Sequence, residues 1–354
     1  MNQIVIVYNA LTLTLVVVAL FLLWRLESRR LFSSAVALGM LLVVFTTTGA
    51  FLSPIDPFGM SQLLCWAVFV HCPVFLVGVA IIARRQNHKP LVIISAFFSI
   101  SIVMIGLYSF LVEPHRLEIS RVTIQSGKLE EPIRVAVIAD LQTDHPEDYE
   151  KHVIELVAAE NPDLILLAGD YLHISDESDY LAAKAKLNAI FLEIGLEASL
   201  GVYAVRGNTD WGDWMEIFAG ISVIPFEGTS SYDLGPLVLT GLSLQDSGNP
   251  NLVVSGQEKF HVVLGHKPDY SLGQVDADLL IAGHTHGGQV RLPFLGPVIM
   301  VSRVPRTWAA GITQLAPGKH LVVSRGIGLE RHNAPRLRFL CRPELVIIDL
   351  LPSE

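Results

Sequence analysis

Four long apolar runs in the first third of the chain constrain its fold more than any other feature. Each is close to the roughly 20 residues that a helix needs to span a bilayer. Backbone groups inside lipid must bond to one another, so helices are the only plausible form for these runs in a membrane. A buried hydrophobic domain is the alternative, but polar faces interrupt such cores and do not interrupt these runs. The runs are Ile4–Leu23, Ser34–Leu52, Leu63–Ala83 and Leu91–Val112.

The charges between the runs predict an orientation. Basic residues follow the first and third runs, whereas the loop Ser53–Ser61 has no Lys or Arg. The positive-inside rule places the two basic links in the cytoplasm, so the chain after Val112 lies outside. This predicts a multi-pass protein of the cytoplasmic membrane with an extracytoplasmic domain. A cleaved signal peptide is not expected, because "MNQ" is not a basic n-region. The basic residues are Arg25, Arg29, Arg30, Arg84, Arg85 and Lys89.

The rest of the chain is acidic. Residues 1–112 carry six Lys or Arg and two Asp or Glu, whereas the remainder carries 19 and 32, a net charge of −13. So acidic a domain is a poor candidate for nucleic-acid binding, which relies on cationic side chains, but it could concentrate metal cations. Cys341 is the only cysteine after residue 112, so this part has no internal disulfide, and cysteine usage does not decide the compartment.

We divide the chain into the membrane region 1–112, a linker 113–132 and a domain 133–354. In the domain, strands first alternate with helices and then dominate, which predicts an α/β layered sandwich. The predicted helices are Glu150–Glu160 and Asp179–Ser199. The predicted strands are Ile133–Ala139, Asp163–Ala168, Gly201–Val205, Leu237–Leu242, Phe260–Leu264, Asp278–Ala282, Leu321–Ser324 and Leu345–Leu350.

Five of these apolar runs end on potential metal ligands. A single Asp at a strand end is usually a turn or cap residue, but five such turns in order are hard to explain that way. Sites in α/β sheets gather outside the carboxyl ends of strands, and mixed N and O ligands without thiolate suit Zn, Mn or Fe pairs. The turns are "VIAD" (Asp140), "LILLAGD" (Asp170), "VYAVRGNTD" (Asn208 and Asp210), "HVVLGH" (His266) and "LLIAGHTH" (His284 and His286).

The series "DLQ", "GD", "GNTD", "GH" and "GHTHGGQ" resembles the motifs of the calcineurin-like metallophosphoesterases, over Ile133 to Leu350. "GHTHGGQVRLP" and "SRGIG…RPELVIIDL" further resemble a bacterial membrane-anchored branch. The resemblance implies an αββα sandwich and two metals about 3.5–4 Å apart, which lower the pKa of bound water and neutralise phosphoryl oxygens. It implies that Asp170 bridges the metals. Asp140, His286 and position 142 then hold the first metal, and Asn208, His266 and His284 hold the second.

Two positions depart from the family's motifs. Gln142 stands where the first metal usually has a histidine, and its amide oxygen, a harder ligand, favours Mn or Mg over Zn. Thr209 stands where a histidine usually acts on the leaving group, and a hydroxyl is not a useful general acid at neutral pH. Three interpretations are open. His145 or His173 substitutes; the leaving group needs no proton; or the domain is a pseudoenzyme, although its other ligands are intact.

Substrate contacts are predicted from two further features. Arg325 and Arg331 belong to a basic stretch in an acidic domain, so they are candidates for binding phosphate or a lipid headgroup, with pairing to surface acids as the alternative. Trp211 and Trp214 follow the third motif, and the apolar segment Arg291–Val301 follows the last. Core packing explains such residues, or they form an apolar rim that meets headgroups or an acyl chain.

These observations predict a membrane-anchored phosphomonoesterase or phosphodiesterase with two divalent ions, Mn favoured and Mg, Zn or Fe possible. Tethering suggests a lipid or lipid-linked phosphate as substrate. One alternative is a cytoplasm-facing hydrolase similar to the UDP-diacylglucosamine hydrolases, which the charge pattern opposes. Another is a non-catalytic sensor or scaffold that binds metal or phosphate.

Overall fold

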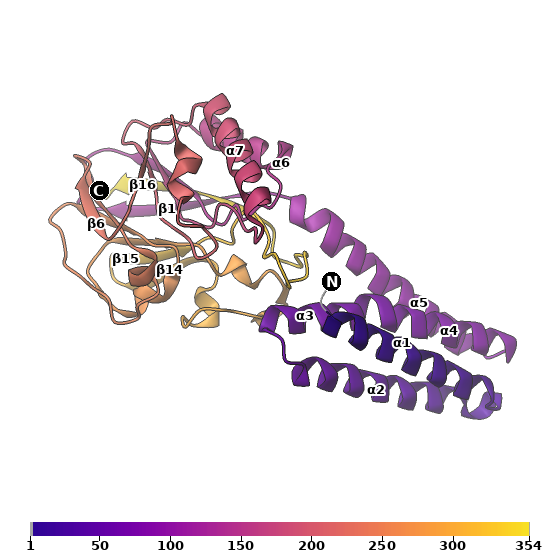
Figure 1. Cartoon of the computed structure of the whole chain (residues 1–354). Coiled ribbons are helices and arrows are strands. Elements are labelled where there is room, and N and C mark those ends of the chain that lie inside the picture. Colours follow the sequence, from indigo (N-terminus) through magenta and orange to yellow (C-terminus); the bar gives the residue numbers. More distant parts are fainter. Residues whose placement is uncertain (1–2, 354) are drawn as a thin grey trace. The chain divides into compact units, whose positions relative to one another are not determined.

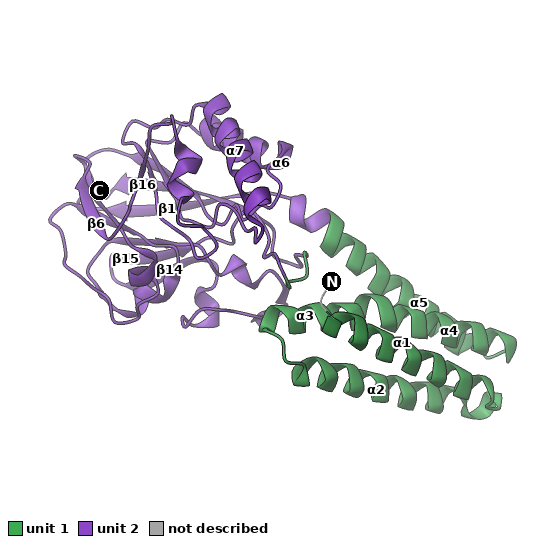
Figure 2. Cartoon of the chain, viewed as in Figure 1, with its two compact units in different colours: residues 1–111, 333–336 green, residues 112–332, 337–354 purple. Residues whose placement is uncertain are grey.

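The computed structural model describes residues 3–353, which form two compact units (Figure 2). One unit runs to Leu111 and takes in residues 333–336, and the other contains Val112–His332 and the chain from Leu337. Residues 1–2 and 354, at the ends of the predicted segments 1–112 and 133–354, lie outside the described residues. The division separates the apolar runs from the series of potential metal ligands.

Residues 3–353 include four helical spans long and apolar enough to cross a membrane. At most 28% of the most apolar window of any span is buried. Apolar side chains left so uncovered suit lipid, which argues against the buried-domain alternative. The spans consist of α1 (Gln3–Trp24), α2 (Ser28–Leu52), α3 (Pro57–Trp66) continued by the π-helical turn η1 (Ala67–His71) and α4 (Cys72–Arg85), and α5 (Lys89–Leu107) continued by η2 (Tyr108–Val112) and η3 (Glu113–His115).

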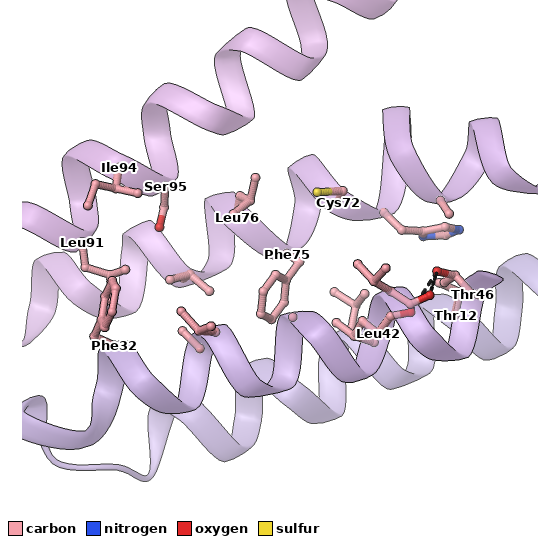
Figure 3. Close-up of a pocket in the computed structure, with 18 residues that line it drawn as sticks. Thr12, Phe32, Leu42, Thr46, Cys72, Phe75, Leu76, Leu91, Ile94 and Ser95 are labelled. Carbon is pink, nitrogen blue, oxygen red and sulfur yellow. Dashed lines mark hydrogen bonds between the residues drawn. The ribbon is translucent and has the colours of Figure 1, made fainter. Parts of the chain in front are cut away.

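The helical unit contains a cavity of about 270 Å³ (Figure 3). Phe75 of α4, Leu42 of α2 and Leu91 of α5 contribute to its largely apolar lining. His71, also in the lining, has its Nε2 atom 2.7 Å from Oδ1 of Asn9 in α1. This contact gives a polar side chain within the third span a partner on a neighbouring helix.

The second unit is built on two six-stranded sheets, β1-β16-β2-β3-β4-β5 and β14-β15-β11-β9-β7-β6. Strands β2 to β5 run parallel, as do β7, β9, β11 and β15, so each set places its carboxyl ends at one edge. The strands are β1 (Glu118–Ser126), β2 (Ile133–Ile138), β3 (Leu164–Leu167), β4 (Val202–Ala204), β5 (Val223–Pro225), β6 (Ser230–Asp233), β7 (Leu237–Gly241), β9 (Phe260–Leu264), β11 (Leu279–Ala282), β14 (Gly311–Ala316), β15 (Lys319–Val323) and β16 (Glu344–Pro352).

Alternating apolar side chains build layers of core on both faces of the first sheet. Along β2, Ala136 and Ile138 pack with helices α6 (Asp148–Ala159) and α7 (Glu177–Ile194), which lie side by side in Figure 1. Val135 and Val137 instead pack with strands of the second sheet. Successive residues of a strand point to opposite faces, so one buried strand serves two layers.

The outer face of the second sheet has a thinner cover than the family resemblance suggests. Its core includes Tyr270 from the short turn η5 (Pro268–Leu272) and Leu242, next to the four-residue α8 (Leu244–Ser247). The predicted α/β sandwich is confirmed, with this outer layer made of short helical turns and loops. The remaining elements are η4 (Trp214–Phe218), β8 (Val253–Val254), β10 (Gln274–Val275), η6 (His286–Gly288), β12 (Arg291–Leu292), β13 (Gly296–Pro297) and η7 (Arg306–Trp308).

The prediction of a linker over residues 113–132 is wrong in its central part. Strand β1 pairs in parallel with β16 along its whole length, from Glu118 to Ser126. Within β1 only Ile124 is fully buried, because the strand lies at the edge of the sheet. An edge strand with so few buried positions lacks the apolar run that identifies a strand in sequence. The folded domain therefore begins before Ile133.

Candidate metal centre

The seven predicted metal ligands follow five parallel strands. Five of the seven have positive φ angles, from 38° at Gln142 to 70° at His284. Non-glycine residues seldom adopt this conformation, and such backbone strain clusters at functional sites. Asp140 and Gln142 follow β2, Asp170 follows β3, Asn208 follows β4, His266 follows β9, and His284 and His286 follow β11.

Two glycines allow the turns after β3 and β4 to approach each other. A Cβ atom on Gly169, whose φ is 87°, would lie 2.5 Å from the Gly207 nitrogen. Asp210 then holds both turns, because its buried carboxylate accepts hydrogen bonds from the backbone nitrogens of Asp170 (2.9 Å), Tyr171 (2.7 Å) and Gly207 (2.7 Å). The last residue of "GNTD" is therefore a positioning group.

The second site comprises Asp170, Asn208, His266 and His284. One ligand atom from each of Asp170, His266 and His284 lies within 4.8 Å of the other two. His266 Nδ1 donates to the Ala168 carbonyl (2.8 Å), which leaves Nε2 of the neutral ring as an acceptor. That atom lies 2.9 Å from Asn208 Oδ1 and 3.4 Å from Asp170 Oδ2. Three acceptors thus converge, and a cation would satisfy them together.

The residues predicted for the first site are Asp140, Gln142, Asp170 and His286. Gln142 Oε1 and both ring nitrogens of His286 are buried and make no hydrogen bond within residues 3–353. Buried polar atoms nearly always have a partner. Asp140, fully buried, accepts from the His284 backbone nitrogen through both carboxylate oxygens (2.9 and 3.0 Å). An amide oxygen, an imidazole and carboxylates form a donor set that fits a divalent metal.

Burial sets the charge state of these groups. It raises the pKa of Asp170 to about 6, and burial followed by repulsion from Asp170 raises the pKa of Asp140 well above its ordinary value. Burial also lowers the pKa of His266 to about 4 and that of His284 to about 3, so both rings are neutral at pH 7. A bound cation would relieve the repulsion between the carboxylates and accept the lone pairs of the neutral rings.

Thr209, at the position where the family's motif has a histidine, is engaged with the backbone. Its hydroxyl donates to the Leu172 carbonyl (2.9 Å), and its backbone nitrogen donates to Asp170 Oδ1 (2.8 Å). The hydroxyl is therefore engaged by a backbone carbonyl. The backbone nitrogen orients the carboxylate predicted to bridge the two metals.

The two histidines predicted as substitutes lie in different surroundings. The His145 side chain is 68% exposed and has its Nε2 atom 3.0 Å from Glu147 Oε1. The His173 side chain is 10% exposed, and its Nδ1 atom lies 2.9 Å from Gln142 Nε2. The structure brings His173 to the first site and leaves His145 at the surface. Their role in proton transfer stays a prediction.

The predicted substrate-binding residues Arg325 and Trp211 make internal contacts. Arg325 lies 3.0 Å from Glu344 and 3.3 Å from Glu118, so two carboxylates already occupy its guanidinium. The Trp211 ring stacks on Tyr180 at 4.5 Å, and its indole nitrogen donates to a backbone carbonyl. These contacts favour pairing with acids for Arg325 and core packing for Trp211, and Trp214 is likewise buried in the core.

Arg331 lies beside the first site. Its Nε atom donates to the Gln142 carbonyl (2.8 Å), and its guanidinium lies 3.1 Å from Asp144. With a side chain only 13% exposed, it fixes the turn that carries Gln142. A direct contact with substrate phosphate stays a prediction.

The sequence analysis missed Glu330, whose side chain is 16% exposed. Glu330 Oε1 lies 3.4 Å from His173 Nδ1, and Oε2 lies 3.2 Å from Gln142 Nε2 and 4.0 Å from His286 Nε2. Burial, then repulsion from Asp170, raises the pKa of Glu330 to about 7. The available signal was an acid next to the "GIG" turn in an otherwise basic stretch.

Comparisons with known proteins agree with this geometry. The sequence model of the calcineurin-like phosphoesterase family matches residues 133–288. The chain is 30% identical over 263 residues to an uncharacterized metallophosphoesterase, YkuE, of Bacillus subtilis, covering 69% of this chain and 88% of that protein. A metallophosphoesterase of Aquifex aeolicus is 29% identical, covering 70% and 97%. The phosphodiesterase YaeI of Escherichia coli is 30% identical, covering 62% and 83%.

Proposed function

Because this chain belongs to the calcineurin-like phosphoesterase family and is thus a metal-dependent phosphoric ester hydrolase, we propose that it hydrolyses a lipid or lipid-linked phosphate at the outer face of the cytoplasmic membrane. The converging ligand atoms of Asp170, His266 and His284, and the unpartnered buried acceptors of Gln142 and His286 among residues 3–353, support the hydrolase. An exposed apolar hairpin that borders the second site carries the choice of a lipid substrate. Phosphomonoesters and phosphodiesters are both within this proposal, and YaeI is named a phosphodiesterase.

The hairpin consists of β12 and β13, which pair antiparallel around the turn 293–295. Phe294 is fully exposed and Leu295 is 69% exposed. Leu292, Val298 and Val301 expose further apolar surface. Soluble surfaces seldom present so many large apolar side chains in one short segment, and a continuous apolar patch marks an interaction site.

Both sides of the hairpin lead to residues of the metal centre. The hairpin starts five residues after His286, and the backbone of Val301, four residues after β13, hydrogen-bonds the His284 imidazole. Arg303 and Arg306, just beyond, are exposed. An apolar tip followed by cationic side chains matches a bilayer surface, with acyl chains below and phosphates above.

We propose that two divalent ions bind, one at each site, with Mn²⁺ favoured because Gln142 offers an amide oxygen instead of an imidazole. When bound, such ions lower the pKa of water and neutralise phosphoryl oxygens. The chain's own residues orient the ligands: Asp210 holds the turns, Ala168 and Val301 fix the imidazoles of His266 and His284, and Thr209 orients Asp170.

Proton delivery to the leaving group is the step for which the family's histidine is missing. His173 is our candidate, because its imidazole contacts Gln142 beside the first site and its side chain is still 10% exposed. A leaving group that needs no proton, such as a nucleotide phosphate or pyrophosphate, would make this donor unnecessary. Comparing substrates with good and poor leaving groups separates these possibilities.

The orientation is a separate part of the proposal. Basic links after α1 and α4 support cytoplasmic placement of those links and an extracytoplasmic domain. A reporter active only outside the cytoplasm, fused after Glu354, is expected to be active. A reporter active only inside would contradict this and favour the cytoplasm-facing alternative similar to the UDP-diacylglucosamine hydrolases.

The activity test uses the full chain in detergent micelles. We expect Mn²⁺-dependent hydrolysis of an aryl phosphodiester and of at least one phospholipid, abolished by Asp170→Asn but not by the control Asp233→Asn on the exposed strand β6. Bound Mn²⁺ without turnover, across Mn, Mg, Zn and Fe and a lipid panel, would contradict the proposal. That outcome would favour a non-catalytic sensor, for which the engaged hydroxyl of Thr209 is the supporting observation.

A further inference from the structure

Glu330 occupies the space beside Gln142, where this chain departs from its family. Its Oε2 atom accepts from Gln142 Nε2 (3.2 Å) and lies 4.0 Å from His286 Nε2. Ligand atoms bound about 2.1 Å from one ion lie roughly 3–4 Å apart, so a single ion can contact both Glu330 Oε2 and His286 Nε2. The His286 ring nitrogens lack hydrogen-bond partners within residues 3–353, which leaves this space for an ion.

Charge supports the same placement. Glu330 interacts with both Asp140 and Asp170, so three largely enclosed carboxylates share the first site. Arg331 and Arg338 are the nearby cations, and both also bond to backbone carbonyls that fix the surrounding turns. Uncompensated carboxylates are costly in an enclosed site, and a divalent cation is the counter-charge that mixed amide, imidazole and carboxylate donors accept.

The loop that carries Glu330 is fastened to the first site on both sides. The Glu330 backbone nitrogen donates to Oε1 of Gln289 (2.9 Å), which lies three residues after His286. The following residue, Arg331, donates to the Gln142 carbonyl (2.8 Å). On the N-terminal side of Glu330, the carbonyls of Gly326 and Gly328 accept hydrogen bonds from the Arg338 side chain. Because the backbone on both sides of Glu330 is held in place, its carboxylate loses little conformational freedom when it binds an ion.

We propose that Glu330 is a ligand of the first metal and replaces the histidine that this chain lacks at position 142. Oε2 is the coordinating atom, while Oε1 lies 3.4 Å from His173 Nδ1. Gln142 then acts through its buried Oε1 and holds Glu330 through Nε2. This inference rests on the metal-dependent function proposed above.

The test measures metal binding, not turnover. The full chain in micelles is stripped with EDTA, titrated with Mn²⁺ by calorimetry, and assayed for bound Mn²⁺ after desalting. Glu330→Gln is expected to weaken one class of site by at least about 10-fold and to lower the retained Mn²⁺ by one ion per chain. The double variant Gln142→His/Glu330→Gln is expected to restore both, because it returns the family's histidine.

The matched control is Asp148→Asn, which removes an exposed carboxylate at the start of α6, six residues after Gln142. It is expected to leave Mn²⁺ binding unchanged. An equal weakening in this control would show a general charge effect and overturn the proposal. So would Glu330→Gln with wild-type Mn²⁺ binding, even if its activity fell, since that result would make Glu330 a proton-transfer group.

Folding and function are kept apart in the same experiment. Equal melting temperatures of wild type and Glu330→Gln in EDTA, with a smaller Mn²⁺-induced rise in the variant, support a ligand role over a structural one. If wild type binds Mn²⁺ with the expected dependence on Glu330 but hydrolyses nothing, the inference stands and the proposed function fails. A wild-type chain that binds no Mn²⁺ overturns both.

Discussion

The proposed first and second metal sites share Asp170 but take their other residues from different kinds of segment. In the second site, Asn208, His266 and His284 each come from a strand-end turn, and two backbone carbonyls orient the imidazoles. In the first site, Asp140 and His286 come from such turns, whereas Gln142 meets Glu330 from a later loop. The comparison teaches that the edges of the parallel strands supply every residue of the second site. We infer that the first site can exchange one ligand for another because a later loop reaches it.

The expected difference in how the two sites respond to substitutions has a physical origin. In the second site, His266 Nε2 lies 2.9 Å from Asn208 Oδ1 and 3.4 Å from Asp170 Oδ2, so a substitution of His266 leaves both neighbours facing a gap. Around Gln142, the neighbouring side chain of Glu330 comes from a separate loop, and loops vary more in sequence among related proteins than the strands that they connect. We therefore expect the second site to be sensitive to single substitutions and the first site to accept compensated pairs.

The largest effect is expected for His266→Gln. Removing the imidazole breaks the group of converging acceptors, so we expect loss of Mn²⁺ from the second site and a fall in kcat/KM of about 10⁴-fold, several kcal/mol. The control is His261→Gln, which changes a buried histidine within β9, the strand before His266, where the ring contacts Thr240. Kinetics and Mn²⁺ content are measured together. A mild effect in His266→Gln would erase the contrast between the sites.

A smaller loss is expected for His173→Gln. If His173 delivers the proton, hydrolysis of a substrate with an alkoxide leaving group falls by about 10²–10³-fold, while hydrolysis of an aryl phosphodiester with an activated leaving group falls much less. His145→Gln serves as the exposed control. Equal losses on both substrates would instead assign His173 to support of Glu330.

The next effect concerns the hairpin beside the second site. Phe294→Glu with Leu295→Glu is expected to lower hydrolysis of a lipid phosphate in vesicles by about 10-fold or more, because each apolar side chain contributes roughly 1.5–3 kcal/mol when buried. Hydrolysis of a soluble aryl phosphodiester should not change. Val253→Glu, at a side chain that is 67% exposed on β8, controls for added charge. A loss on both substrates would indicate damage to His284 instead of lost membrane contact.

The smallest effect is expected for Thr209→Ala. Its hydroxyl bonds to the Leu172 carbonyl, so its loss should cost about 1 kcal/mol of stability and less than about 10-fold in kcat/KM. Thermal melting and kinetics check this. A drop comparable with that of His173→Gln would place the hydroxyl in contact with substrate and revise the account of the missing histidine.

Sequence patterns could predict the second site because its information is local. A buried apolar strand that ends on Gly and a ligand places that ligand at the sheet edge whatever the rest of the chain does, as for Asp170 after β3 and His266 after β9. The four spans are equally local, since length and apolarity alone identify them. The order of ligands along the chain thus predicted much of the centre before any packing was known.

The missed features depend on contacts between distant segments. Glu330 meets Gln142 from 188 positions away, and its local signal, an acid in a basic stretch, does not predict that contact. Strand β1 was taken for a linker because its pairing with β16 spans most of the domain and buries only Ile124 completely. Arg325 was assigned to substrate from its charge, whereas its carboxylate partners, Glu344 and Glu118, are set by that same pairing of strands.

The position of β16 bears on how the domain is made. This strand lies between β1 and β2 in the first sheet, although it follows every other strand of both sheets in the sequence. Ribosomes synthesise the chain from the N-terminus, so the helical spans and nearly the whole domain emerge before the strand that joins β1 to the rest. Until then β1 and β2 present open edges, which are prone to pairing with other chains. A nascent chain stalled before Glu344 would therefore be a substrate for chaperones and proteases at the membrane.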